Sequence, residues 1–329
     1  MKQFTSLFAL LVFLNTTANA QSEQHDWLSF PDSLNKTRLY ISAGTGLAIY
    51  SGFSVILWEA WYKQSEIGGF RTFDDSKEWL QMDKAGHFFT AWVESHNSFN
   101  GARWTGMKRK NALITAVGVG VGLQATIEIM DGFAADWGFS WADIGANTGG
   151  VLFFLTQDML WKEQRLKMKV SGSPVSYSNE PIMSATGNAT TTLRQRATDL
   201  YGQGDAAAFF KDYNAQTIWI SANIHDFLPN RDQSKFPKWL NIAFGYGAEG
   251  LYGGFENRWT DGDAAFILDP NLYPRYRQFY LSFDVDMSKI KTKKPIPRLL
   301  LNLLNWVKIP SPALEINTLG KAKFHPLMW

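Results

Sequence analysis

The chain has 329 residues, which is more than one small domain needs and is enough for two. Its 32 Lys and Arg residues are nearly balanced by 30 Asp and Glu residues, and the formal net charge of +2 gives no indication of nucleic-acid binding. Cysteine is absent, which excludes disulfides, thiolate metal sites and a lipid-modified cysteine within these residues.

The first twenty residues have the three parts of a secretory signal. Lys2 precedes an apolar run over residues 4–14, and residues 18–20, Ala-Asn-Ala, form a small-x-small cleavage pattern. We therefore expect residues 1–20 to be removed and the mature protein to be exported. Residues 21–38 are polar and predict an extended lead-in.

Four apolar stretches between residues 39 and 165 predict a four-helix bundle. The first stretch, residues 39–58, is uncharged and long enough to cross a membrane, but its serines and glycines are equally typical of a helix that packs on others. The other helices are expected at about 83–99, 110–131 and 141–161. Glycines four residues apart predict close helix contacts at Gly118 with Gly122 and at Gly145 with Gly149.

Polar residues recur at the ends of the three later helices. Asp83 and His87 lie one turn apart at a predicted helix start, and Glu128 and Asp131 lie near the end of the next helix. If neighbouring helices are antiparallel and joined by short loops, these helix ends lie together. The residues expected to meet at this end are Asp83, His87, Glu128, Asp131, Ser140, Asp143 and Asn147.

Three interpretations of this cluster remain open. Acidic residues cap helix starts, so the cluster can be a polar network that locks the bundle. Imidazole and carboxylate groups can also bind an ion, with a divalent metal as one possibility, or a polar head group. For catalysis, the candidates are His87 as the base and Asp83, Glu128, Asp131 and Asp143 as acids or metal ligands. No other cofactor is predicted.

Charge is distributed unequally between the two ends of the predicted bundle. The positive-inside tendency would place the basic end in the cytoplasm, whereas a cleaved signal places the mature N-terminus, with Lys36 and Arg38, on the exported side. These requirements conflict for an inner-membrane protein but not for an outer-membrane protein, to which that insertion rule does not apply. We therefore favour the outer membrane over the inner one.

The second half of the chain changes from a helical to a strand pattern. Residues 166–192 predict a linker, and residues 193–329 predict a mainly β domain that begins with a short helix at Leu193–Tyr201. Alternating apolar and polar residues predict four strands, and this number is too small for a complete barrel. The strands are expected at Thr217–Asn223, Trp239–Tyr246, Phe279–Asp286 and Leu314–Asn317. Residues 297–310 predict an amphipathic helix that lies on a membrane or covers the sheet.

The polar motifs resemble those of the YfiM-like family of predicted exported bacterial lipoproteins, a domain of unknown function. The matching residues occur in the order Asp83-Lys84, His87-Phe88, Glu128, Asp131, Ser140-Trp141, Asp143 and Gly149. The chain is also similar to the broader VanZ-like group, whose ending Ser-x-x-Asp-x-x-x-Asn-x-x-Gly is matched by Ser140, Asp143, Asn147 and Gly150. The resemblance covers residues 39–162.

The resemblance implies a fold and a cellular location but no reaction. Lipoprotein members carry a lipidated cysteine, which this chain lacks, so we expect anchoring through its own apolar surface. Sequence and resemblance together predict an α+β protein, in which a membrane-associated four-helix bundle precedes a mainly β domain. The predicted function is a non-enzymatic envelope component that binds an ion, a lipid head group or an envelope partner. The alternative is a hydrolase or transferase that acts on a membrane-borne lipid or cell-wall precursor.

Overall fold

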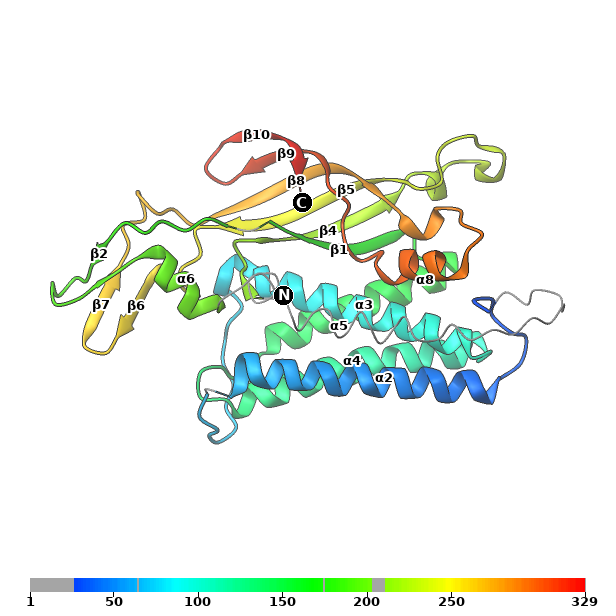
Figure 1. Cartoon of the computed structure of the whole chain (residues 1–329), viewed down its shortest axis with the longest axis horizontal. Helices are drawn as coiled ribbons and strands as arrows, with labels where there is room; N and C mark the ends of the chain where they lie inside the picture. The colour runs from blue at the N-terminus through cyan, green and yellow to red at the C-terminus, as the bar shows by residue number, and fades with distance from the viewer. Residues whose placement is uncertain (1–26, 64, 174, 203–210, 329) are drawn as a thin grey trace.

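The computed structural model describes residues 27–63, 65–173, 175–202 and 211–328 (Figure 1). The predicted signal sequence, residues 1–20, lies outside the described residues. Helices occupy the first half of the described chain and a β-sheet dominates the second half. This arrangement confirms the predicted α+β class.

The long helices follow the apolar stretches of the sequence. Helix α2 passes into one turn of π-helix at its end, and the helices are α2 Lys36–Leu57, α3 Met82–Trp104, α4 Arg109–Phe133 and α5 Trp141–Trp161. Asn35 caps α2, because its side-chain oxygen accepts a hydrogen bond from the Arg38 amide at 3.0 Å. The starts and ends differ from the predictions by a few residues, as is usual for helix termini.

Helices α4 and α5 pack closely against α3 through small residues. A Cβ atom on Gly120 would lie 2.3 Å from Ser95 Oγ, and one on Gly150 would lie 2.2 Å from the Phe88 carbonyl oxygen. Glycine is therefore needed at both positions, because any side chain would push the helices apart. The predicted contact glycines Gly118, Gly122 and Gly145 instead have nothing within 4 Å of such an atom, so that part of the prediction is wrong.

Helix α2 lies beside this three-helix layer and has no buried residue. It is joined to the end of α3 at its N-terminus, where the Asn35 amide donates to the Thr105 carbonyl at 2.8 Å. A four-helix bundle is therefore not confirmed, because one of the four helices buries nothing. Both α2 and α4 are long and apolar enough to cross a membrane, with 0% and 22% of their most apolar windows buried.

Six antiparallel strands form one sheet in the order β1-β4-β5-β8-β9-β10. Its strands are β1 Leu166–Gly172, β4 Gln216–Asn223, β5 Leu240–Glu249, β8 Tyr276–Val285, β9 Ser311–Asn317 and β10 Ala322–Met328. All four predicted strands are present. The predicted linker at 166–192 begins with β1, so the sheet starts inside that segment.

Smaller elements surround the sheet. They are the paired strands β2 Ile182–Met183 and β3 Thr190–Thr191, the hairpin strands β6 Arg258–Asp261 and β7 Ala264–Ile267, and the helices α6 Leu193–Tyr201 and α8 Pro295–Leu303. Helix α6 has the predicted bounds. Helix α8 covers only the first part of the predicted amphipathic segment, and Trp306, which follows it, packs on Phe89 of α3.

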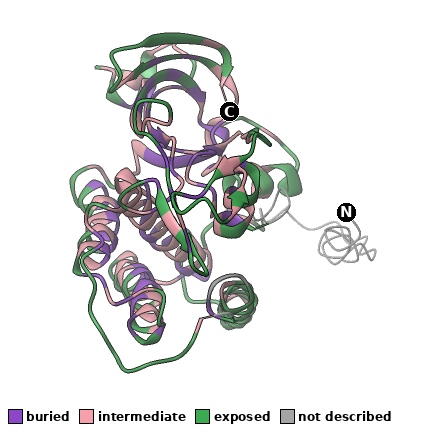
Figure 2. Ribbon diagram, turned by 90° about the vertical axis from the view of Figure 1, so that its left-hand side faces the viewer, coloured by how far each residue is buried: buried purple, intermediate pink, exposed green. Residues whose placement is uncertain are grey.

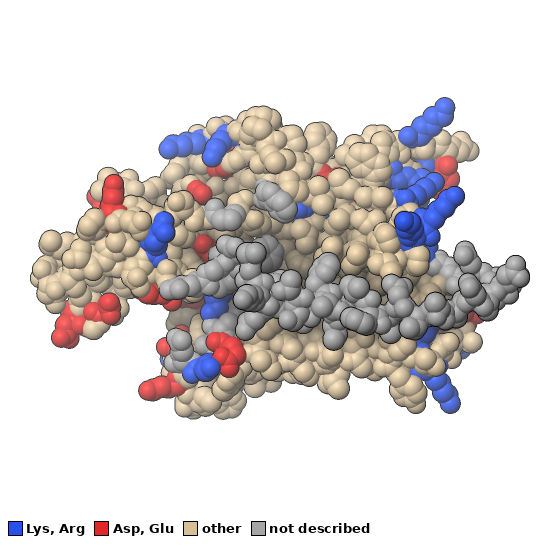
Figure 3. All heavy atoms as spheres, in the orientation of Figure 1, with Lys and Arg blue, Asp and Glu red and all other residues tan. Residues whose placement is uncertain are grey.

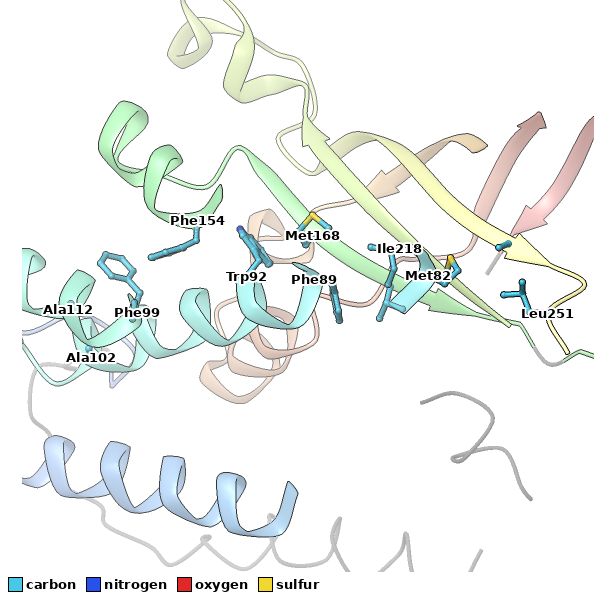
Figure 4. Packing of buried hydrophobic residues seen from close by; sticks show 13 residues of the cluster. Met82, Phe89, Trp92, Phe99, Ala102, Ala112, Phe154, Met168, Ile218 and Leu251 are labelled. Carbon is cyan, nitrogen blue, oxygen red and sulfur yellow. The ribbon is translucent and has the colours of Figure 1, made fainter. Parts of the chain in front are cut away.

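The core lies between α3 and the first two strands of the sheet (Figure 4). Phe89 and Trp92 of α3 pack against Met168 of β1 and Ile218 of β4. Viewed along the long axis, the sheet is strongly curved and lies above the helices (Figure 2). The helix layer and the sheet therefore share one apolar core, which fixes their relative positions.

Candidate functional site

The predicted polar residues lie together at one end of the helix layer. Asp83 and His87 occupy the first turns of α3, and Glu128 and Asp131 lie near the end of α4. Ser140 caps α5, because its hydroxyl accepts a hydrogen bond from the Asp143 amide at 3.0 Å. The cap fixes the first turn of α5, and Asp143 projects from that turn towards His87.

His87 is the centre of the site. Its Nδ1 atom lies 3.1 Å from Asn147 Oδ1 and 3.5 Å from Glu128 Oε1. Its Nε2 atom lies 3.6 Å from Asp83 Oδ1 and 3.7 Å from Asp143 Oδ1. Three helices thus supply the groups around one imidazole, and the side chains of Glu128, Asp143 and Asn147 are buried.

Lys84 binds three of the carboxylates at once. Its Nζ atom lies 2.6 Å from Asp75 Oδ2, 2.8 Å from Asp83 Oδ2 and 2.7 Å from Asp143 Oδ1. The ammonium group of Lys84 is the partner of Asp143 Oδ1, which is buried. Asp75 comes from the loop before α3 and also accepts a hydrogen bond from the Ser140 hydroxyl.

Two tyrosines connect the site to the rest of the molecule. The Tyr213 hydroxyl donates to Asp83 Oδ1 at 2.9 Å, and the Tyr62 hydroxyl donates to Asp131 Oδ1 at 2.6 Å. Asp131 is therefore held at the edge of the cluster by the chain that follows α2. Lys84, Asp75 and the two tyrosines were not among the predicted site residues. Of these, Lys84 carried a sequence signal as the second residue of the Asp-Lys motif, and Asp75 carried one as an acidic residue in the segment before the helix.

The backbone before α3 is held in an unusual conformation. Trp79, Leu80 and Gln81 have φ values of 49°, 50° and 62°, which bulky residues rarely adopt. The Tyr246 hydroxyl of β5 donates to the Leu80 carbonyl, and the Trp79 amide donates to the Gly254 carbonyl at 2.8 Å. Contacts from the β domain therefore fix the turn from which Asp83 emerges.

Burial and mutual repulsion raise the pKa values of three acids of the site. Burial raises the pKa of Glu128 to about 7 and that of Asp131 to about 6. Burial and the neighbouring Asp83 carboxylate raise the pKa of Asp143 to about 8. Asp83 is the exception: burial opposes its ionisation, but His87 and Lys84 lower its pKa below the usual value.

The bases of the site are charged at neutral pH. Burial lowers the pKa of His87, but the carboxylates of Asp83, Asp143 and Glu128 outweigh burial and raise it to about 9. Two cationic side chains, Lys84 and His87, thus face five carboxyl groups, which are those of Asp75, Asp83, Glu128, Asp131 and Asp143. Because the carboxyl groups outnumber the cationic side chains, Asp143 and part of Glu128 carry protons at neutral pH.

One set of three residues has the arrangement of metal ligands. Asp83, His87 and Asp143 each offer one donor atom, and these atoms all lie within 4.8 Å of one another. The donor chemistry fits zinc or a similar divalent transition metal, which binds imidazole nitrogen and carboxylate oxygen. Asn147 and Glu128 lie on the other nitrogen of His87, where they would orient the ring.

An apolar cavity of about 240 Å³ lies beside the site. Tyr62, whose hydroxyl binds Asp131, is part of its wall. The remaining wall residues come from the end of α2, the end of α4 and the following loops, and they are Trp58, Ser65, Ile67, Ile129, Met130, Phe133 and Ala134. The cavity offers apolar contacts next to a polar cluster.

Comparison with known proteins gives one match. No curated protein and no solved structure matches the chain. A family model described as predicted periplasmic lipoprotein (DUF2279) matches residues 71–157, a segment that contains His87 and every other predicted site residue. The match does not confirm the YfiM or VanZ names. It agrees with an exported protein of the cell envelope, and over this segment the chain is similar to a family of unknown function.

Proposed function

We propose that the protein is a non-enzymatic component of the cell envelope that binds a divalent cation through Asp83, His87 and Asp143. The observation that carries this proposal is the position of His87 Nε2, which lies 3.6 Å from Asp83 Oδ1 and 3.7 Å from Asp143 Oδ1. Donor atoms about 2.0–2.1 Å from a tetrahedral ion are about 3.4 Å apart. Small side-chain movements would therefore bring all three donors onto one ion.

The surrounding groups support cation binding. Tyr213 donates to Asp83 Oδ1, which fixes that carboxylate without adding a positive charge. The surplus of carboxyl groups over cationic groups favours an added cation, because the ion would relieve the repulsion that raises the pKa of Asp143. A phosphate or carboxylate ligand would add to that repulsion.

Lys84 can keep its other partners when the ion binds. An ion on Asp143 Oδ1 would displace the ammonium group from that atom, which lies 2.7 Å away. The ammonium would still contact Asp75 Oδ2 and Asp83 Oδ2. Lys84 thus serves as the resident cation of the ion-free site, and it would not be left unpaired after the exchange.

Calorimetry with zinc tests the proposal. The purified chain is stripped with a chelator and titrated with Zn²⁺, and the metal content before stripping is measured by elemental analysis. We expect one ion per chain in the unchanged protein and none in His87→Ala. His325→Ala is the matched control, because His325 also pairs with a carboxylate, that of Glu315 at 2.7 Å, but lies in β10. Equal binding by the unchanged protein and His87→Ala would refute the proposal.

The cavity beside the site supports a second candidate function. A hydrolase or transferase that acts on a lipid-linked precursor needs an apolar pocket next to acid–base groups. The Tyr62–Asp131 contact joins such a pocket to the cluster, and His87 would act as the base. Turnover of a lipid-linked substrate that disappears in His87→Ala and persists in His325→Ala would favour this function over binding alone.

A further inference from the structure

The sheet has charged residues on its inner face. Lys169 of β1 and Asp284 of β8 form an ion pair of 2.7 Å, and both side chains are completely buried. Lys167 and Asp286 form a second buried pair of 2.6 Å. Sheets of water-soluble proteins normally bury their apolar face, so this sheet has the opposite polarity over much of its area.

The outer face of the sheet carries large apolar side chains that are exposed. Phe244 of β5, Leu281 of β8 and Leu314 of β9 are directly paired in register, as are Phe279 of β8 and Ile316 of β9. The exposed members of this face, which we call the outer sheet face, are Ile220, Phe244, Phe279, Leu281, Phe283, Leu314, Ile316 and Phe324, each exposed by 40–63%. They form one continuous patch across five strands.

Helix α3 covers only one side of this face. Ile218 of β4 and Val170 of β1 pack on the helix layer, in the core shared with Trp92. The end of β5 is covered as well, because Tyr246 and Ala248 belong to the same core. Over the rest of β5, β8 and β9, none of the elements within the described ranges covers the outer sheet face, and Phe244, Phe283 and Leu314 remain more than half exposed. Such a patch on a protein in water is normally a binding surface.

We propose that the outer sheet face is in contact with the acyl chains of a lipid bilayer. Its large exposed side chains are Ile, Leu and Phe, and Tyr246 and Arg277 of this face are partly buried against the turn before α3. Protein interfaces are instead enriched in exposed Tyr, Trp and Arg and have a polar rim. An apolar outside with a polar inside is typical of sheets in membranes. On the face shown in Figure 3, charged side chains gather towards the two ends of the long axis, and few are visible over the uncovered upper part between them.

This surface is separate from the cation site. The outer sheet face lies on β4, β5, β8, β9 and β10, whereas the cation site lies at the helix ends. Among the described residues, β10 has no strand beside its outer edge. Hydrocarbon cannot form hydrogen bonds with the backbone groups of such an edge. We therefore place this edge, with its exposed Lys323 and the register shift after His325, at the level of the head groups. Failure of either proposal leaves the other intact.

Single-cysteine labelling tests the lipid contact. The chain has no cysteine, so a cysteine placed at Phe283 or Leu314 is the only reactive thiol. Each variant of the full chain carries an environment-sensitive fluorophore and is reconstituted with vesicles of phosphatidylethanolamine and phosphatidylglycerol. Nitroxide-labelled acyl chains report contact by quenching. Ile267→Cys is the matched control, because Ile267 is 65% exposed but lies in the β6–β7 hairpin.

We expect blue-shifted emission and loss of most of the fluorescence for labels at Phe283→Cys and Leu314→Cys, and little change for Ile267→Cys. Circular dichroism establishes that each variant is folded. Quenching no greater than in the control would overturn the proposal. A blue shift without quenching would also overturn it, because the face would then be covered by protein, such as a second copy of the chain.

Discussion

The molecule has two buried charge clusters, one inside the sheet and one at the helix ends, and they differ in how their charges are paired. In the sheet, two lysines have one aspartate each: Lys169 pairs with Asp284, and Lys167 pairs with Asp286. A third buried lysine, Lys308, lies near Asp284 and donates to the Ser311 hydroxyl at 2.8 Å. Asp286 also accepts hydrogen bonds from the Ser288 hydroxyl at 2.5 Å and the Asn305 amide at 2.9 Å. At the helix ends, two cationic side chains share five carboxyl groups, and no carboxylate has a cation of its own.

The pKa values of the acids follow this difference. Burial opposes ionisation of Asp286, but Lys167 and the hydrogen bonds lower its pKa to about 2. Burial and Asp83 raise the pKa of Asp143 to about 8. Buried charges that are matched and fully hydrogen-bonded hold a fold together, whereas a surplus of one sign costs stability unless a ligand binds. This difference supports a structural role for the charges of the sheet and agrees with the proposed cation binding at the helix ends.

The largest expected loss of stability follows a substitution in the sheet. Asp284→Ala leaves the ammonium of Lys169 buried and unpaired, and we expect the free energy of unfolding to fall by about 3–5 kcal/mol. Denaturant unfolding followed by circular dichroism measures this loss. The double variant Lys169→Met with Asp284→Leu removes both charges and should recover part of the loss, because Lys308 and the Ser221 hydroxyl also lose Asp284 as a partner. A single variant as stable as the unchanged protein would show that this pair does not hold the sheet.

A smaller loss is expected at the helix ends, with one diagnostic difference. Lys84→Met removes the cation shared by Asp75, Asp83 and Asp143, and we expect the free energy of unfolding to fall by about 2–3 kcal/mol in the presence of a chelator. Zn²⁺ should restore most of this stability because it replaces the lost charge. It should not restore Asp284→Ala. If Zn²⁺ stabilised Lys84→Met and Asp284→Ala equally, the cluster at the helix ends would not differ from the sheet in cation binding.

The helix-end cluster was largely predictable because helical periodicity fixes where a side chain lies. Asp83 and His87 are one turn apart, and antiparallel neighbours bring Glu128 and Asp143 to the same end. Tyr213 could not be predicted, because it lies 130 residues from Asp83 and the contact depends on how the sheet packs on α3. Periodicity is a local signal, and packing between the two halves is not local.

The sheet interior was missed for a different reason. Residues 166–170 read Leu-Lys-Met-Lys-Val, and charged residues at alternate positions normally indicate a solvent-exposed face. In the structure both lysines point into the sheet, because Asp284 and Asp286 come from a strand end that lies across from them. The partners are more than a hundred residues away, so nothing near β1 in the sequence indicates a buried pair.

Cation binding at the helix ends should depend on pH. The raised pKa of His87, about 9, means that its ring is protonated at pH 7 and must lose a proton before it can bind a metal. Asp143, with its pKa of about 8, must also lose a proton. We therefore expect the affinity for Zn²⁺ to rise by up to about a hundredfold per pH unit from pH 7 to 8, about tenfold from pH 8 to 9, and to level off above about pH 9. Calorimetry in buffers of different ionisation enthalpy counts the released protons. A flat profile would mean that His87 is not a ligand.

The smallest expected change in the free energy of unfolding is a gain, whereas Asp284→Ala is expected to cause a loss. Burial raises the pKa of Glu128 to about 7, so its ionised form is less stable in the folded protein than in the unfolded chain. Removing the charge recovers up to about 3 kcal/mol at pH 8, but the glutamine loses an acceptor for the amides of Ser140 and Asn147. We therefore expect Glu128→Gln to raise the free energy of unfolding by about 1 kcal/mol at pH 8, measured with a chelator present. The gain should vanish near pH 4, where the carboxyl group is protonated in both states. A loss of stability at pH 8 would show that the Glu128 charge is matched, as the charges of the sheet are, and the surplus would then be confined to Asp143 and Asp131.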